Sequence, residues 1–219
     1  MIVSKVCSLP MRKKKKHPPK ANQKTTRPVG ASNEVALAVI KVATILAAVD
    51  GVYRAEEKAK LRAIAKQFQK LRGVNKILLD CDEKATKVAA MRKNRAKITD
   101  VFKKSKTSVD VAECIKVIAE DVAYAYPAIL SWVSMCCCDS DYAQAEQKAV
   151  EILCAMLSKE CDAKIPMSFV RKAEKHIKNI VLAQNLRNKV KDPFRKSNLS
   201  DVIAFEQDVL VRMAKGKEF

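Results

Sequence analysis

Two acidic segments hold the side chains whose types and spacing could do chemistry. In each segment a glutamate lies seven residues after the first aspartate. Carboxylate oxygens are the ligands that calcium and magnesium prefer, and converging carboxylates need a cation or a basic side chain to relieve their repulsion. If the two segments lie side by side in the fold, the sequence predicts a shared patch that holds a divalent cation or docks a basic protein partner. Its candidate residues are Asp50, Glu56, Glu57, Asp139, Asp141 and Glu146.

The same residues also have a structural interpretation. The glutamates of the first segment would lie in the first turn of a helix, where the helix dipole favours each carboxylate by roughly 0.3–1 kcal/mol. An EF-hand is excluded, because Asp139 and Asp141 fit its first and third positions but Gln144 and Val150 stand where glycine and glutamate are required. A cation or partner site and helix-start chemistry both remain open.

Each acidic segment joins two predicted helices. Glu34–Val49 is apolar on nearly every side, which predicts a central helix, and Gly51 supplies the left-handed position that ends it. Apolar residues at three- and four-residue steps predict an amphipathic helix over Lys58–Leu71. The second segment joins an apolar helix, Ala128–Cys138, to an amphipathic one, Lys148–Leu157.

The other helical patterns complete an all-α fold. The first helix is expected to be capped by Ser32 or Asn33. Residues 189–200 are predicted to form a polar connection to a last helix, whose apolar stripe is Val202, Phe205, Val209, Leu210 and Met213. No alternating stretch is long enough to predict a strand. We expect a single orthogonal bundle of about eight helices that contains two pseudo-repeated helix-turn-helix units.

An apolar helix, an Asp-Gly turn, four variable residues and Glu-Glu before a second helix resemble the tellurite-resistance TerB-like family. The first copy is Ala48-Val49-Asp50-Gly51 with Glu56 and Glu57. The second copy has Ser140 where glycine is usual and Ala145 in place of the first glutamate. The resemblance covers about residues 34–160. It implies an all-helical binding module whose acidic turns face a partner or a cation, in stress response or phage defence.

Composition and charge bound the class of protein. The chain has 219 residues and four glycines, too few and too scattered for a P-loop or a dinucleotide-binding loop. No apolar run reaches the roughly 18 residues of a membrane span, and the N-terminus lacks the apolar core of a signal peptide. The eight cysteines show no zinc spacing and are predicted to be small, reduced core residues, so we expect a cytoplasmic protein.

Basic residues gather in two regions. Residues 1–32 are predicted to be a disordered arm, because they carry nine basic residues, several prolines and no acid, and residues 33–219 a helical domain with a C-terminal extension from about 165. Residues 84–106 carry nine basic residues against Asp100 alone. Both regions predict contact with nucleic-acid phosphates or another anionic surface, anionic lipid included, with a solvated face as the alternative. The candidates are Arg12, Lys13, Lys14, Lys15, Lys16, Lys20, Arg92, Lys93, Arg95, Lys97, Lys103 and Lys104.

Catalysis is not predicted. The two histidines, His17 and His176, have no evident serine or cysteine partner for nucleophilic chemistry. We therefore expect no enzyme and no cofactor beyond a divalent cation at the acidic turns. The leading hypothesis is a TerB-like binding or scaffold module with a protein partner. The alternative is a non-specific nucleic-acid-associated protein, of viral or phage origin in one version, that binds through the arm and residues 84–106.

Overall fold

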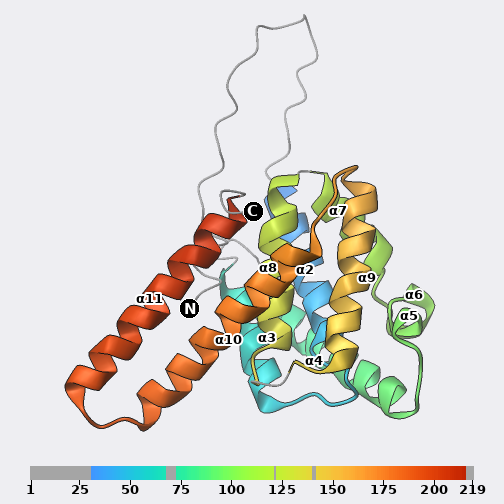
Figure 1. Ribbon diagram of the computed structural model, residues 1–219. Helices are drawn as coiled ribbons and strands as arrows, with labels where there is room; N and C mark the ends of the chain where they lie inside the picture. Colours follow the sequence, from blue (N-terminus) through green and yellow to red (C-terminus); the bar gives the residue numbers. More distant parts are fainter. Residues whose placement is uncertain (1–30, 68–72, 121, 140–141, 216–219) are drawn as a thin grey trace, which may run out of the picture.

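The computed structural model describes residues 31–67, 73–120, 122–139 and 142–215. Over these residues all regular structure is helical and no strand is present, which confirms the predicted all-α class (Figure 1). In chain order the elements are α2 (Ala31–Leu46), α3 (Ala55–Gln67), α4 (Val74–Lys93), α5 (Ile98–Val101), α6 (Lys104–Thr107), α7 (Val111–Ala119), a 3-10 turn (Val122–Tyr124), α8 (Ala125–Cys136), α9 (Gln144–Glu160), α10 (Met167–Lys189) and α11 (Pro193–Ala214). The described helices outnumber the expected eight because short ones, such as α6, break up the connections.

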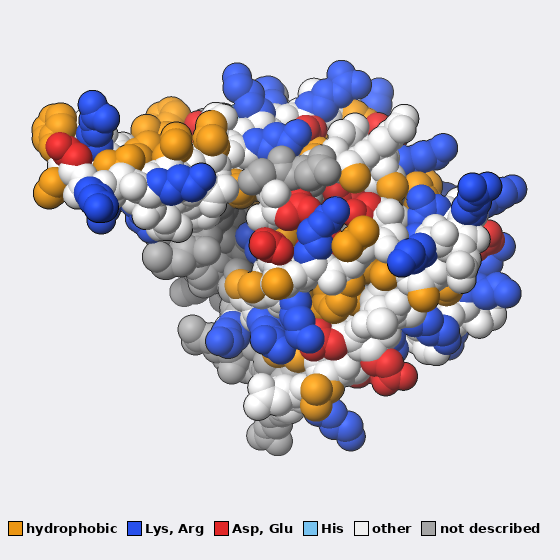
Figure 2. All heavy atoms as spheres, turned by 90° about the horizontal axis from the view of Figure 1, so that it is seen from below, with side chains coloured by type: hydrophobic (Ala, Val, Ile, Leu, Met, Phe, Trp, Pro, Cys, Tyr) orange, Lys and Arg blue, Asp and Glu red, His pale blue; other side chains and the backbone are white. Residues whose placement is uncertain are grey.

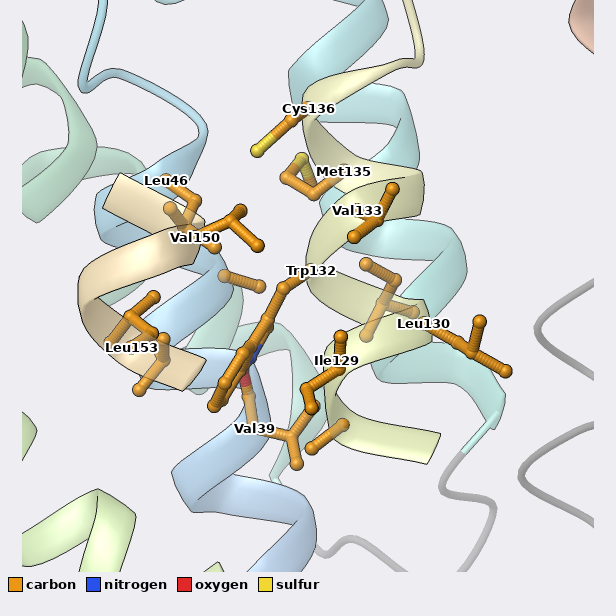
Figure 3. Close-up of a cluster of buried hydrophobic side chains, with 14 of the residues drawn as sticks. Val39, Leu46, Ile129, Leu130, Trp132, Val133, Met135, Cys136, Val150 and Leu153 are labelled. Atoms are coloured by element: carbon orange, nitrogen blue, oxygen red, sulfur yellow. The ribbon is translucent and has the colours of Figure 1, made fainter. Parts of the chain in front are cut away.

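Helix α2 is the centre of the bundle, as its apolar sequence predicts. Each residue from Val42 to Val49 is buried, and α2 packs against α3, α4, α7, α8 and α9. Trp132 of α8 is fully buried against it, and its indole nitrogen donates a hydrogen bond of 3.3 Å to the Val39 carbonyl oxygen. Figure 3 shows this ring between Val39, Ile129 and Leu153. Such a packed centre fixes how the ends of α2 and α8 lie relative to each other.

Cysteines contribute to this core. Five of the described cysteines are buried, Cys138 and Cys161 are partly buried, and all seven are free thiols. They behave as the small apolar residues that the sequence predicts. None of the helices in the described ranges has the length and apolar character that a membrane span requires.

Helices α10 and α11 form a hairpin that packs on α8 and extends beyond the rest of the bundle (Figure 1). The connection between them is short, so the predicted polar connection over residues 189–200 is wrong. Asp192 begins α11 by accepting a hydrogen bond of 2.8 Å from the Arg195 backbone nitrogen, and Pro193 follows in the first turn, where proline needs no donor. Asp192 as the cap and Pro193 in the first turn therefore begin α11. The polar and charged composition of residues 189–200 had favoured a connection over a helix.

The helix start at residue 31 also differs from the expected one. Helix α2 already includes Ser32 and Asn33, so neither residue precedes the helix as a cap. The rest of the predicted arm, residues 1–30 with Arg12, Lys13, Lys14, Lys15, Lys16 and Lys20, lies outside the described residues. Asp141 lies outside them as well.

Candidate functional site

The two acidic turns meet in space, and a side chain of the chain itself lies between them. The Arg54 guanidinium contacts Asp50 Oδ2 at 3.1 Å and Asp139 Oδ2 at 2.9 Å through the same nitrogen, Nη1. Both aspartate side chains are nearly buried, whereas the arginine is about one-third exposed. The guanidinium thus neutralises the repulsion that convergence of the turns would cause, in the place where a metal ion or a partner's basic side chain was predicted.

The first turn is shaped by Asp50 and Gly51. The Asp50 Oδ1 atom accepts a hydrogen bond of 2.9 Å from the Val52 backbone nitrogen, which closes the turn locally. Gly51 has a φ angle of 100°, a conformation that other residues rarely adopt, and it packs against Arg92 and Lys93 at the end of α4. The Asp-Gly pair is therefore required for the path of the backbone between α2 and α3.

Glu57 and Glu146 take up equivalent positions in their turns. Each is almost fully buried, and each accepts a hydrogen bond from the backbone nitrogen three residues earlier, Arg54 for Glu57 and Ala143 for Glu146. This contact satisfies a free donor at the start of α3 and of α9. Both glutamates therefore carry out the helix-start chemistry that was the structural alternative for the acidic segments.

Burial makes both glutamates weak acids. It raises the pKa of Glu57 to about 7, against the hydrogen bond from the Arg54 nitrogen that lowers it. Burial likewise raises the pKa of Glu146 to about 8, and the nearby charges of Asp50, Asp139 and Glu57 add to the effect. At pH 7 Glu146 is therefore largely uncharged, and Glu57 is about half ionised.

A cysteine run and a lysine lie beside the junction of the two turns. Burial raises the pKa of the Cys137 and Cys138 thiols to about 12, and it lowers the pKa of the Lys60 ammonium. A thiol is a nucleophile and a metal ligand only as a thiolate, so these cysteines are unreactive at neutral pH. Chemistry at the junction would have to come from the carboxylates.

The remaining acidic candidates do not extend the junction into a ligand cage. Glu56 lies exposed in the first turn of α3. Over the described residues, no three His, Cys, Asp or Glu side chains are arranged to hold a metal ion. Figure 2 looks onto the end of the bundle from below and shows acidic, basic and hydrophobic side chains intermixed there, without a continuous acidic face.

The basic candidates after residue 84 divide into two groups. Arg92 is half-buried and holds the backbone: its Nε donates to the Val49 carbonyl oxygen at 2.6 Å, and its Nη1 donates to the Ala96 carbonyl oxygen. It therefore caps the C-terminal end of α2, which is a structural role. The sequence could not show this use, because the bonded carbonyl lies 43 residues away.

Six other basic residues form what we call the basic corner: Lys93, Arg95, Lys97, Lys103, Lys104 and Lys106. All six are exposed, and α4, α5 and α6, which carry or adjoin them, pack against one another. Lys103 pairs with Asp100 at 2.8 Å and Lys104 with Asp110 at 3.7 Å. Lys93, Arg95 and Lys97 have no carboxylate within ion-pair distance among the described residues. Figure 2 shows Lys and Arg side chains concentrated along the edge of the molecule where α5 and α6 lie in Figure 1.

Two polar networks were not predicted. The Tyr53 hydroxyl donates to Asp82 Oδ1 at 2.6 Å, and Lys58 pairs with the same carboxylate at 2.9 Å, which ties the first turn to α4. In the hairpin, buried Glu206 accepts a hydrogen bond of 2.7 Å from Asn179 and contacts His176 Nδ1. A carboxylate inside the apolar pattern of α11 was the signal that could have revealed the second network.

No family model, curated protein or solved structure matches the chain.

Proposed function

We propose that this protein is a non-enzymatic helical binding module that contacts the phosphate backbone of nucleic acid through the basic corner. The observation that supports it is that Lys93, Arg95 and Lys97 are exposed and have no carboxylate within ion-pair distance among the described residues. Phosphate contacts are favoured by cationic side chains without an ion-pair partner, because a phosphate competes with any existing ion pair. The paired lysines, Lys103 and Lys104, are exposed and can exchange their weak surface partners for a phosphate.

The geometry of the corner favours backbone contact over sequence reading. The basic residues lie at the C-terminal end of α4, in the connections that flank α5, and in α6, a helix of four residues. None of them is spread along one face of a long helix that could enter a groove. Lysine is a flexible point charge that suits a phosphate and discriminates little between bases. The expected binding is therefore non-specific, strongly dependent on salt and shared with the basic arm, whose residues would add contacts of the same kind.

The acidic turns have a different part in this proposal. Arg54 already compensates Asp50 and Asp139, and the buried glutamates cap two helices. We assign to them the joining of the two halves of the bundle, so the basic corner is held on a rigid support. Docking of a protein partner or a divalent cation at the turns, the TerB-like resemblance and a role in stress response or phage defence stay predictions.

The test is nucleic-acid binding by two matched triple variants. In the first, Lys93, Arg95 and Lys97 are changed to glutamate; in the second, three exposed basic residues of α10, Arg171, Lys172 and Lys175, are changed in the same way. Both variants lose the same net charge. Each lost phosphate contact lowers the slope of log affinity against log salt by about 0.9 for duplex DNA, so three contacts lower it by about 2.7. Fluorescence anisotropy over a salt series measures this slope.

The corner variant should show this decrease of about 2.7 in the slope, whereas the α10 variant should keep the slope of the unmodified protein. Equal losses in the two variants would show that binding depends on net charge alone and would overturn the basic corner as the site. Unchanged binding in the corner variant would do the same. Removal of residues 1–30, which leaves α2 intact, then measures the share of the arm.

A further inference from the structure

The hairpin of α10 and α11 exposes a set of large apolar side chains that the bundle does not use. Its members are Leu182, Leu186, Phe194, Val202 and Phe205, and they are five of the seven large hydrophobic residues found exposed in the described ranges. Phe194 is 75 % exposed, Phe205 63 % and Leu182 60 %. Single exposed leucines are ordinary, but a cluster with two phenylalanines marks a contact surface. We call these five residues the apolar face of the hairpin.

These side chains are not part of the buried side of α11. Ile203, Glu206 and Leu210 are buried there, and Glu206 is bonded to His176 and Asn179 of α10. The predicted stripe placed Val202 and Phe205 inward, and this part of the prediction is wrong. The neighbouring residues Ile203 and Glu206 lie on the buried side of α11 instead. Nothing in the packing of the hairpin therefore requires the apolar face.

The spacing gathers the apolar face along each helix. Leu182 and Leu186 are four residues apart, about one turn of α10. Phe194 and Phe205 are eleven residues apart, about three turns of α11, so they lie on the same side of it. Figure 2 shows hydrophobic side chains along the projecting hairpin, interleaved with Lys and Arg side chains.

The tip of the hairpin is strongly basic. Between residues 187 and 196 the basic side chains are Arg187, Lys189, Lys191, Arg195 and Lys196, and the only acidic one is Asp192. Asp192 already accepts the hydrogen bond that begins α11. The other acids on α11, Asp201, buried Glu206 and Asp208, lie about two to four turns from its start. We call these five basic residues the cationic collar. Phe194 is thus an exposed apolar side chain at the tip, surrounded in sequence by the collar.

We propose that this tip docks onto an anionic phospholipid surface, with Phe194 and Leu186 entering the headgroup region and the collar contacting lipid phosphates and carboxylates. Apolar side chains flanked by lysine and arginine bind membrane interfaces through both burial and charge. A second copy of this chain is a poorer occupant, since two tips of the same positive charge would face each other. Figure 1 shows that the hairpin extends beyond the rest of the bundle, so its apex can reach a flat surface.

The test must separate insertion of the tip from attraction of the basic arm or the basic corner to the same lipid. Phe194→Trp places a fluorescent side chain at the apex, and Leu79→Trp places one at an equally exposed site on α4, where Leu79 is 71 % exposed. The native Trp132 is fully buried and supplies a constant background. Full-length protein is mixed with vesicles of phosphatidylcholine alone, or of phosphatidylcholine and phosphatidylserine, with brominated lipid as a quencher.

We expect a blue shift and quenching for Phe194→Trp on phosphatidylserine vesicles, and neither change for Leu79→Trp. Changing Lys189 or Lys191 to glutamine should weaken sedimentation with these vesicles about fivefold for each charge removed. Phe194→Ser should weaken it further without unfolding the chain, because Phe194 is exposed. An emission of Phe194→Trp that stays solvent-like while the protein sediments would overturn the proposal and assign the binding to other basic residues. A dimer that Phe194→Ser dissociates, without insertion into vesicles, would assign the apolar face to a second copy.

Discussion

Replacing Arg54 with methionine tests whether one guanidinium holds the two acidic turns together. Methionine keeps most of the aliphatic length of arginine and removes the charge that contacts Asp50 and Asp139. These two carboxylates would then face each other, with Glu57 and Glu146 close behind them. We expect lower stability of the whole bundle, because the turns join α2 to α3 and α8 to α9.

The magnitude follows from the exposure of the partners. An exposed ion pair contributes about 0.2–1 kcal/mol, whereas removing one partner of a buried pair costs about 3–5 kcal/mol. The Arg54 side chain is 37 % exposed, but its two aspartates are only 12 % and 11 % exposed. Each pair therefore lies between the two limits, and we expect Arg54→Met to lower the free energy of unfolding by about 2–3 kcal/mol.

Urea unfolding followed by circular dichroism measures this change, with Arg62→Met as the matched control. Arg62 is 52 % exposed and lies 3.9 Å from Asp82, so its replacement should cost less than about 0.5 kcal/mol. Added salt should restore part of the stability of Arg54→Met by screening the repulsion of the carboxylates. Combining the change with Asp139→Asn should cost less than the sum of the two single changes. A loss for Arg54→Met no larger than that of the control would refute the role assigned to Arg54.

Three further predictions concern groups near the turns and in the core. The raised pKa of Glu146 means that the folded chain binds this proton more tightly than the unfolded chain, so the free energy of unfolding should fall as pH rises from about 4.5 to about 8. Glu146→Gln should reduce this fall by on the order of 4 kcal/mol. Urea unfolding at both ends of the pH range measures the difference. Gly51→Ala forces a residue with a Cβ to a φ of 100° and should cost about 1–2 kcal/mol in thermal unfolding. The buried Ser134 hydroxyl has no hydrogen-bond partner in the described part of the chain, so Ser134→Ala should raise the free energy of unfolding by about 1 kcal/mol. Ser131→Ala removes a hydrogen bond of 2.9 Å to the Pro127 carbonyl oxygen and should lower the free energy of unfolding by about as much.

The sequence was sufficient for the elements whose signal is local. The burial of α2 follows from its apolar residues on every side, and the end of the first turn follows from Gly51, whose positive φ the structure shows. The meeting of the two turns was only a conditional expectation, because nothing local relates segments so far apart. Arg54 could not be identified as their link, since its contact with Asp139 spans 85 residues.

The errors at the C-terminal end have a different cause. Two helical registers fit α11, one with Val202 and Phe205 inward and one with Ile203 and Glu206 inward. Apolar pattern alone favours the first, because it leaves the carboxylate in water. The structure adopts the second, where His176 and Asn179 of α10 satisfy that carboxylate. The orientation of α11 thus depends on His176 and Asn179, which the sequence pattern of α11 alone cannot reveal. Because Glu206 faces inward, Val202 and Phe205 are left on the exposed apolar face of the hairpin.

Internal use of acidic residues makes the surface more positive than composition suggests. Asp50 and Asp139 pair with Arg54, and Glu206 is buried in the hairpin. Glu57 and Glu146 have pKa values of about 7 and about 8. The formal net charge of +19 counts these five side chains as negative and Arg54 as positive, so the internal groups together subtract four charges from the rest of the chain. The basic corner and the hairpin tip both carry part of this positive excess, but the binding proposed for each should depend differently on salt concentration. Screening should remove phosphate binding at the corner completely, whereas lipid binding at the tip should keep a residual part, because burial of Phe194 is not screened.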